Sequence, residues 1–221
     1  MTLFDILGPV MVGPSSSHTA GAVRIGAMGR RLLGEKPVRA VVGLHGSFAD
    51  TGLGHGTDRA IIAGLLGMAS DDVRIPDSFR LAEQAGLEFQ FRVVNLRGAH
   101  PNTALLELTG QAGNTVKMQA SSLGGGRILV NRLDDIEVNF TGEYNTLIVH
   151  NLDQPGHVGE VTTLLAQNAV NIAFMSLYRN RRGGYAVMVI ETDQLVPEAA
   201  QQTLRAIPGV LKVTFIEKEA G

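Results

Sequence analysis

Residues 13–21, with the sequence GPSSSHTAG, place three consecutive serines, a histidine and a threonine immediately before an apolar helical stripe. Hydroxyl groups and free backbone N–H groups at a helix N-terminus suit an anion such as a carboxylate or a phosphate. One serine is enough to cap a helix, so the alternative is an N-cap at Ser17 or Thr19 with surplus hydroxyls. Three serines followed by His18 exceed that need, which favours a ligand site.

Residues 46–58, with the sequence GSFADTGLGHGTD, form a second polar loop, expected between a strand and a helix. Its small residues let the backbone approach a ligand, and His55 lies between two glycines rather than in an apolar segment. The alternative is that Thr57 or Asp58 only caps the following helix. Because the glycine spacing matches neither a Walker A loop nor a dinucleotide-binding fingerprint, a different kind of ligand loop is favoured.

Residues 97–103, with the sequence RGAHPNT, link two expected strands. Turn formation alone explains Pro101 and Asn102, whereas His100 and Asn102 also offer hydrogen bonds to a small polar substrate. Both interpretations stay open. The histidines of the three loops have no carboxylate partners at ligand spacing, so we expect no metal ion held by this chain alone.

The elements that must position these loops mix helices with strands, which predicts an α+β domain over residues 1–142. Apolar spacing predicts helices at 17–33, 57–66 and 76–86, and strands at 38–45, 87–95, 103–109, 115–121, 127–133 and 136–140. The boundary to the next domain is expected near residues 141–144.

Residues 145–221 follow a regular β-α-β-β-α-β order, which predicts a second, ferredoxin-like domain. The strands are expected at 145–150, 170–178, 185–191 and 210–217, and the helices at 156–168 and 197–207. His150 is expected to end the first of these strands and to have no catalytic part.

Composition excludes several kinds of site. The chain has no cysteine, which rules out disulfides, thiolate zinc sites, a cysteine nucleophile and a cysteine-ligated iron–sulfur cluster held by this chain alone. With a net charge of −2 it has no basic stripe for nucleic acid. No signal peptide or membrane span is visible, so we expect a cytoplasmic protein without a membrane partner.

The segments GPSSSHTAG, DTGLGHGTD (50–58), AHPNT (99–103) and SLGGGRI (122–128) together resemble the iron–sulfur-dependent L-serine dehydratases. The resemblance covers the whole N-terminal domain and implies a fold like the allosteric-substrate-binding domain of phosphoglycerate dehydrogenases. In that family a [4Fe–4S] cluster with one open iron site binds serine, a base removes the Cα proton, and hydroxide leaves. The resulting aminoacrylate becomes pyruvate and ammonia.

The family's cluster cysteines belong to an α portion that this chain lacks. The resemblance is therefore to the β chain of the two-subunit form, which needs an α subunit to ligate the cluster. It implies His18 as the candidate for proton transfer, although an α-chain base is equally open. The residues implied to bind L-serine are Ser15, Ser16, Ser17, Thr19, His55, Thr57, His100 and Asn102.

Residues 151–156 (NLDQPG) and 170–172 (VNI) resemble ACT domains, especially the serine-sensing one of phosphoglycerate dehydrogenase. The resemblance implies an amino-acid effector bound by Asn151, Asp153 and Asn171, and a homodimer formed through this domain. The alternative is that Pro155 and Gly156 only start a helix and the domain only dimerises. Two further hypotheses for the whole chain are a stand-alone amino-acid sensor and a metal-independent phosphate-binding domain.

Overall fold

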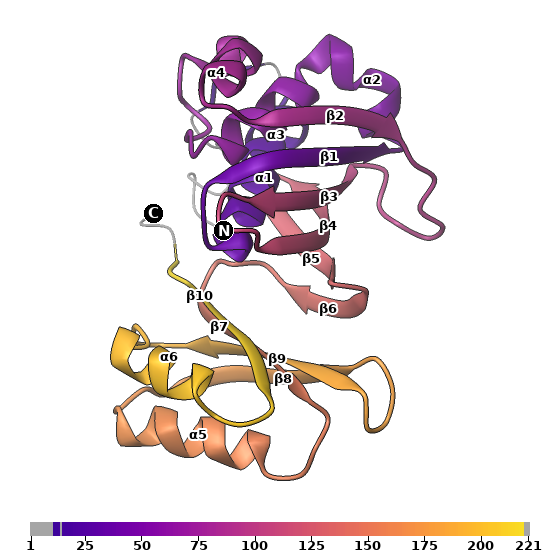
Figure 1. Cartoon of the computed structure of the whole chain (residues 1–221). Helices are drawn as coiled ribbons and strands as arrows, with labels where there is room; N and C mark the ends of the chain where they lie inside the picture. Colours follow the sequence, from indigo (N-terminus) through magenta and orange to yellow (C-terminus); the bar gives the residue numbers. More distant parts are fainter. Residues whose placement is uncertain (1–10, 14, 219–221) are drawn as a thin grey trace, which may run out of the picture. The chain divides into compact units, whose positions relative to one another are not determined.

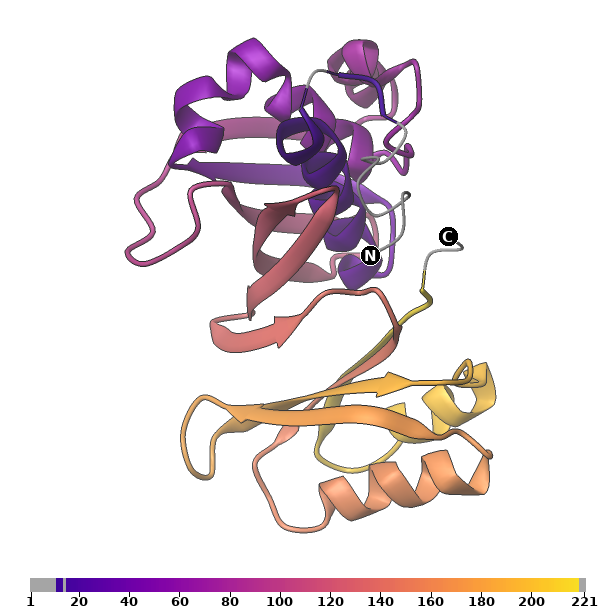
Figure 2. The same cartoon turned by 180° about the vertical axis from the view of Figure 1, so that it is seen from behind.

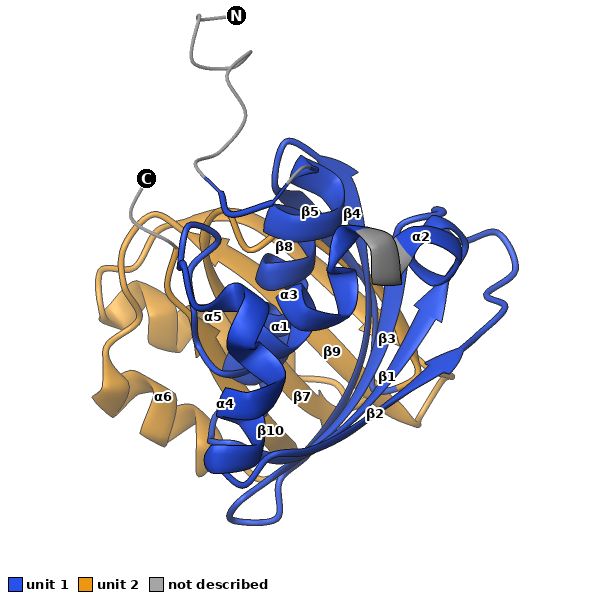
Figure 3. Ribbon diagram, turned by 90° about the horizontal axis from the view of Figure 1, so that it is seen from above, with its two compact units in different colours: residues 1–134 blue, residues 135–221 orange. Residues whose placement is uncertain are grey.

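The computed structural model of the chain describes residues 11–13 and 15–218. Within these residues the strands form two sheets, one of six strands and one of four (Figures 1 and 2). Contacts divide the chain into two compact units, Met1–Asp134 and Asp135–Gly221 (Figure 3). Each unit combines helices with strands, which confirms the predicted α+β class.

The first sheet has the strand order β2-β1-β3-β4-β5-β6. Its strands are β1 (Pro37–His45), β2 (Glu88–Val93), β3 (Thr103–Gly110), β4 (Thr115–Gly124), β5 (Arg127–Leu133) and β6 (Ile136–Phe140). Strands β1 and β2 are parallel, whereas β1, β3, β4 and β5 pair with one another in antiparallel fashion. A parallel pair needs a long crossover, and the helices between β1 and β2 supply it.

Three helices of the first unit gather on one face of this sheet (Figure 3). They are α1 (Gly21–Leu33), α3 (Thr57–Leu65) and α4 (Ser78–Gln84), which follows the 3-10 turn η3 (Ile75–Asp77). Between the helices and the sheet lie fully buried side chains such as Ile25, Leu32, Ile61, Leu106 and Met118. Their burial supplies the main stabilisation of this unit.

Helices α1 and α3 approach each other closely at two glycines. A Cβ atom at Gly26 would lie 2.1 Å from the carbonyl oxygen of Ile61, and one at Gly64 would lie 2.0 Å from that of Val23. Backbone atoms of each helix thus occupy the space that a side chain would need on the other. This contact holds the N-terminal end of α1 close to α3.

The second unit follows the order β7-α5-β8-β9-α6-β10, and its sheet has the order β10-β7-β9-β8. The elements are β7 (Asn145–Leu152), α5 (His157–Gln167), β8 (Ile172–Arg179), β9 (Tyr185–Thr192), α6 (Glu198–Arg205) and β10 (Val210–Ile216). Both helices cover one face of the sheet (Figure 1), over a core that includes Leu147, Val161, Leu165 and Leu204. The predicted ferredoxin-like order is confirmed.

Three segments differ from the sequence prediction. The loop expected at residues 46–58 contains a helix, α2 (Ser47–His55), and the helix expected at 17–33 begins with a π-helical turn, η2 (Ser16–Ala20). The predicted domain boundary, between residues 142 and 145, lies after β6. The contacts instead divide the chain between Asp134 and Asp135, before β6.

None of the helices in the described residues has both the length and the apolar character that crossing a membrane requires.

Candidate functional site

The π-helical turn η2 carries the serine-rich motif and presents His18. Ser15 precedes the turn with extended backbone, at φ −138° and ψ 122°, and its Oγ accepts a hydrogen bond of 3.2 Å from the backbone N–H of His18. Ser15 is therefore the capping residue, and the prediction of a cap at Ser17 or Thr19 is wrong. Because Ser15 caps the turn, the hydroxyls of Ser16 and Ser17 are not needed for capping.

The imidazole of His18 is only 8% exposed and lies against α2. Its Nε2 is 3.2 Å from Ser47 Oγ and 3.1 Å from Thr51 Oγ1, and its ring centroid is 4.9 Å from that of His55. Burial lowers the pKa of His18, a hydrogen bond with the Ser47 backbone partly opposes this, and the nearby His55 lowers it further. A ring that stays neutral near pH 7 is able to accept a proton.

Helix α2 exists where glycines predicted a loop because its first turn is anchored on both sides. Phe48 is completely buried and its ring centroid is 5.3 Å from that of His18. Gly46, with φ +57°, starts the helix, and a Cβ atom there would lie 2.7 Å from the carbonyl oxygen of Pro101. The third polar loop therefore packs against the start of α2.

The third loop also joins the end of β4. The backbone N–H of Ser122 donates to the carbonyl oxygen of Asn102 over 2.8 Å. Ser122 in turn faces the start of α1, since a Cβ atom at Gly21 would lie 2.0 Å from Ser122 Oγ. The exposed His100 accepts a 3.1 Å hydrogen bond at Nδ1 from the backbone N–H of Asn102, and its carbonyl oxygen accepts one of 2.6 Å from Thr103 Oγ1. His100 therefore acts within its own turn.

Buried oxygens without partners mark the region where these loops meet. Within the described residues of the first unit, four buried side-chain oxygens have no hydrogen-bond partner, namely Thr19 Oγ1, Thr57 Oγ1, Asn102 Oδ1 and Ser122 Oγ. Each belongs to a different one of the four motif segments. Leaving such a group unpaired costs about 1–3 kcal/mol, so their concentration in these segments indicates a site that binds a polar molecule.

The predicted residues are brought together unevenly. His18 and His55 are in contact, Thr19 shares the η2 turn with His18, and Ser15 caps that turn. Helix α3 follows Gly56 at its N-cap position, so Thr57 does not cap it. Asp58 Oδ1 accepts a 2.8 Å hydrogen bond from the backbone N–H of Arg59 in the first turn of the helix. Sequence reasoning missed Ser47, Thr51 and Ser122. Only the helical form of α2 reveals the first two, because residues four apart share a helix face.

No group of three or more His, Cys, Asp or Glu side chains in the described residues is placed to hold a metal ion. The whole sequence contains no cysteine. Iron–sulfur clusters are held by cysteine thiolates, so the donor set of this chain does not fit ligation of such a cluster.

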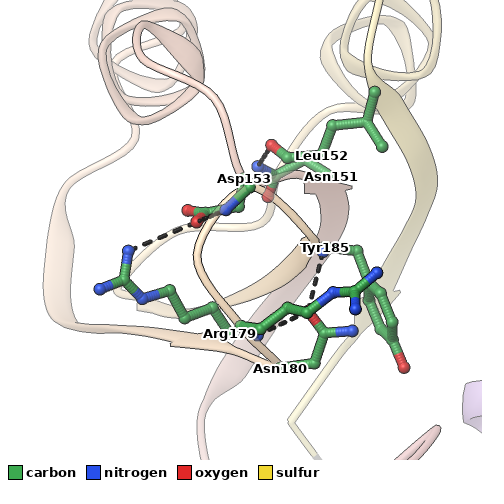
Figure 4. Close-up of polar contacts among 8 residues, drawn as sticks. Asn151, Leu152, Asp153, Arg179, Asn180 and Tyr185 are labelled. Atoms are coloured by element: carbon green, nitrogen blue, oxygen red, sulfur yellow. Dashed lines mark hydrogen bonds and ion pairs between the residues drawn. The ribbon is translucent and has the colours of Figure 1, made fainter.

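Two of the predicted effector residues lie where β7 ends, Asn151 within the strand and Asp153 in the loop after it (Figure 4). Asp153 Oδ2 accepts hydrogen bonds from the backbone N–H of Gly183, at 2.9 Å, and from Nη1 of Arg179, at 3.3 Å. Asn151 is 2% exposed; its amide donates to the carbonyl oxygen of Leu152 over 2.6 Å, and its Oδ1 has no partner in the described residues. The Asp153 carboxylate thus ties its loop to the β8–β9 hairpin.

The third predicted effector residue, Asn171, lies at the opposite end of the sheet. Leu152 pairs with Tyr185 at one end of β9, whereas Ile172, the neighbour of Asn171, pairs with Thr192 at the other. The Asn171 side chain donates to Asp193 Oδ2 over 2.7 Å. A single copy of the chain therefore does not bring Asn171 together with Asp153, and an effector site formed by all three residues stays a prediction.

Comparison with known proteins identifies relatives over nearly the whole chain. A family model described as "Serine dehydratase beta chain" matches residues 2–88, and one described as "ACT domain" matches residues 145–209. The "Probable L-serine dehydratase, beta chain" of Bacillus subtilis (strain 168) is 40% identical over 215 residues, which are 97% of each chain. The "L-serine dehydratase, beta chain" of Peptoniphilus asaccharolyticus is 35% identical over 215 residues, again 97% of each chain.

A more distant relative covers part of the chain. The "D-3-phosphoglycerate dehydrogenase" of Bacillus subtilis (strain 168) is 23% identical over 162 residues, which are 72% of this chain and 30% of that protein. The resemblances to serine dehydratases and to ACT domains seen in the sequence motifs are confirmed. The chain belongs to the family of L-serine dehydratase beta chains.

Proposed function

We propose that this chain is the β subunit of an L-serine ammonia-lyase, which converts L-serine to pyruvate and ammonia together with a separate α subunit. The observation that carries the proposal is the set of four buried, unpaired oxygens at Thr19, Thr57, Asn102 and Ser122. A zwitterionic amino acid with a hydroxyl group offers both donors and acceptors for such a set. The relatives that match 97% of the chain are named as beta chains of this enzyme, which supports the same function.

The roles of the residues follow from their positions. The N–H groups of the η2 turn and the hydroxyls of Ser15, Ser16 and Ser17 lie at the start of a helix, where a carboxylate is favoured. His18 is buried and its pKa is lowered, mainly by that burial, so its neutral ring is available to accept the proton that leaves Cα. Thr57 and Asn102 would bind the remaining polar groups of serine.

We propose that the [4Fe–4S] cluster expected for this enzyme is ligated by cysteines of the α subunit. The cysteine-free sequence of this chain supports that division, because cluster ligands must then come from elsewhere. This chain would contribute the serine-rich loop, His18 and the surrounding hydroxyls, and the α subunit would complete the pocket.

For the second unit we propose a homodimer that binds an amino-acid effector at its interface. Strand β8 is an edge of the sheet, and Phe174 and Leu177 on it are 54% and 49% exposed. If two copies of β8 paired antiparallel, the start of one strand would face the end of the other. Asn171 of one copy would then approach the hairpin that Asp153 of the second copy holds, and a composite site would form.

The proposed function is tested by an anaerobic assay of pyruvate formation from serine. The pure chain, supplied with iron and sulfide, should form no pyruvate and no brown chromophore, and activity should appear only when the α subunit is added. Pyruvate formation by the chain alone would refute the division of labour. A sensor complete in itself would instead bind serine alone and show no gain of activity with the α subunit.

The homodimer is tested by the mass of the full chain at micromolar concentration. We expect twice the monomer mass. The dimer should form without an amino-acid effector, so this mass should not depend on adding one. A monomeric mass would refute the interface.

A further inference from the structure

The hydrogen bonds around His18 define where the protons of its ring lie. Thr51 Oγ1 donates to the carbonyl oxygen of Ser47 over 2.8 Å, and a carbonyl cannot donate in return. The single hydrogen of the Thr51 hydroxyl is therefore used. Thr51 Oγ1 is also 3.1 Å from Nε2 of His18, so at this contact the oxygen must accept. The donor is an N–H at Nε2.

The other ring nitrogen faces Ser15. The backbone N–H of His18 donates to Ser15 Oγ over 3.2 Å, and the same oxygen is 3.3 Å from Nδ1. When Nε2 carries the proton of the neutral ring, Nδ1 has a free lone pair, and the Ser15 hydroxyl donates to it. Every donor in this chain of contacts then meets an acceptor, the Ser47 hydroxyl over the longest distance, 3.5 Å to Thr51 Oγ1.

The opposite tautomer fits the same contacts poorly. A lone pair on Nε2 would face a lone pair of Thr51, although the Ser47 hydroxyl, at 3.2 Å, would still donate to it. On the other side, Ser15 Oγ would have to accept from both the backbone N–H and Nδ1–H, and its own hydrogen would have no acceptor among the described residues. The local geometry therefore selects one tautomer.

We propose that Thr51 holds neutral His18 as the Nε2–H tautomer, so that Nδ1 is the proton-accepting atom and Ser15 carries the proton between Nδ1 and the substrate. The proposal rests on the proposed function and adds a positioning residue, Thr51, and a relay residue, Ser15. A proton that reaches Ser15 Oγ is matched by transfer of the Ser15 hydroxyl proton to Nδ1. Ser15 stays neutral, and the positive charge resides on His18 until the proton returns by the same path.

The burial of the two residues agrees with this order. Ser15 is half-buried whereas His18 is 8% exposed, so a substrate reaches the serine before it reaches the ring. Helix α2 covers the Nε2 side of the ring through Ser47 and Thr51. Thr51 on that side is itself exposed, so the order of transfer follows from the tautomer, which leaves the lone pair on Nδ1.

The tautomer is measured on the full chain by NMR of ¹⁵N-labelled histidine at about pH 8, where a histidine is neutral. The chain has six histidines, and His18→Gln identifies the signals of His18. We expect Nε2 to show the shift and coupling of a protonated nitrogen and Nδ1 those of an unprotonated one. A protonated Nδ1, or an even mixture of tautomers, would overturn the proposal whether or not the chain is a dehydratase subunit.

The role of Thr51 is measured in the complex with the α subunit. Thr51→Val should lower kcat for serine about five- to tenfold, the effect of one hydrogen bond, with little change in KM, and Thr51→Ser should restore it. Thr203→Val is the matched control, because Thr203 Oγ1 donates to the carbonyl oxygen of Ala199 over 2.9 Å on an exposed helix without a histidine. It should leave kcat unchanged.

Two results of the activity assay would overturn the assignment of Thr51: wild-type kcat in Thr51→Val, or a loss that Thr51→Ser does not restore. Ser15→Ala should reduce kcat by about a hundredfold or more, because the relay is broken. Wild-type kcat in Ser15→Ala would overturn the relay. A wild-type complex that does not convert serine at all would instead refute the proposed function, and the NMR result would still decide the tautomer.

Discussion

Helices α1 and α3 cross at Gly26 and Gly64 with no room for a methyl group at either position. An alanine Cβ at Gly64 would lie 2.0 Å from the carbonyl oxygen of Val23 and 2.7 Å from the backbone nitrogen of Ala27. Backbone atoms cannot turn away as the end of a flexible side chain can, so the helices must separate. We predict that Gly64→Ala destabilises the protein and shifts α1, together with the His18 turn that precedes it.

The size of the effect follows from two opposing terms. Overpacking costs about 1–3 kcal/mol, and a contact of 2.0 Å with a backbone oxygen puts Gly64 in the upper part of that range, about 2–3 kcal/mol. Replacing glycine by alanine within a helix gains about 1 kcal/mol. A loss of roughly 1–2 kcal/mol in the free energy of unfolding is therefore expected for Gly64→Ala, measured by urea denaturation. Gly159→Ala in α5 is the matched control, because no atom lies within 4 Å of its Cβ position.

The control should be stabilised by roughly 0.5–1 kcal/mol, since only the helix-propensity term acts there. Gly26→Ala, whose Cβ would lie 2.1 Å from the carbonyl oxygen of Ile61, should behave like Gly64→Ala. If Gly64→Ala were as stable as the wild type or more stable, the close crossing of these helices would be refuted.

Three further predictions concern charged groups. Burial, and secondarily the nearby Glu143, raises the pKa of Glu191, so the ionised carboxylate destabilises the fold at pH 7 and Glu191→Gln should raise Tm there. This gain should disappear at pH values below the ordinary carboxyl pKa, where Glu191 and the glutamine are both uncharged. Burial lowers the pKa of His18, so the wild type should lose stability relative to His18→Gln as the pH falls below 6.5, the ordinary pKa of histidine. Urea denaturation of both proteins at several pH values measures this difference. Arg179→Gln should cost at most about 1 kcal/mol in the free energy of unfolding, because the Arg179 side chain is 56% exposed although that of Asp153 is only 17% exposed. Asp153→Ala should lower Tm further, because it also leaves the Gly183 N–H unpaired.

The regular periodicity of the second unit made its fold predictable. Strands such as β7 and β9 are bounded by turn residues, and the helix starting after Pro155 has its apolar residues at helical spacing. Helix α2 was missed because Gly52 and Gly54 have low helix propensity. The burial of Phe48 and the packing of Gly46 against Pro101 are tertiary contacts, which local sequence patterns do not contain.

The candidate site was predictable in part for the same reason. The residue types of GPSSSHTAG pointed to His18 directly, because so many hydroxyls exceed the needs of a helix cap. Thr51 could be connected with His18 only once residues 47–55 were known to be helical. The sequence did not show how Asn171 and Asp153 lie within one copy of the chain, because strand register, which places them at opposite ends of β9, is not visible in it.

The most direct test of the central claim, that this chain supplies His18 to a serine dehydratase site, is pyruvate formation by His18→Ala in the complex with the α subunit. Anaerobic assays should show that kcat/KM for serine falls by about two to four orders of magnitude, the usual contribution of a general base, while the variant still folds and binds the α subunit. A kcat/KM close to that of the wild-type complex would contradict the account, because the proton would then be moved without this histidine.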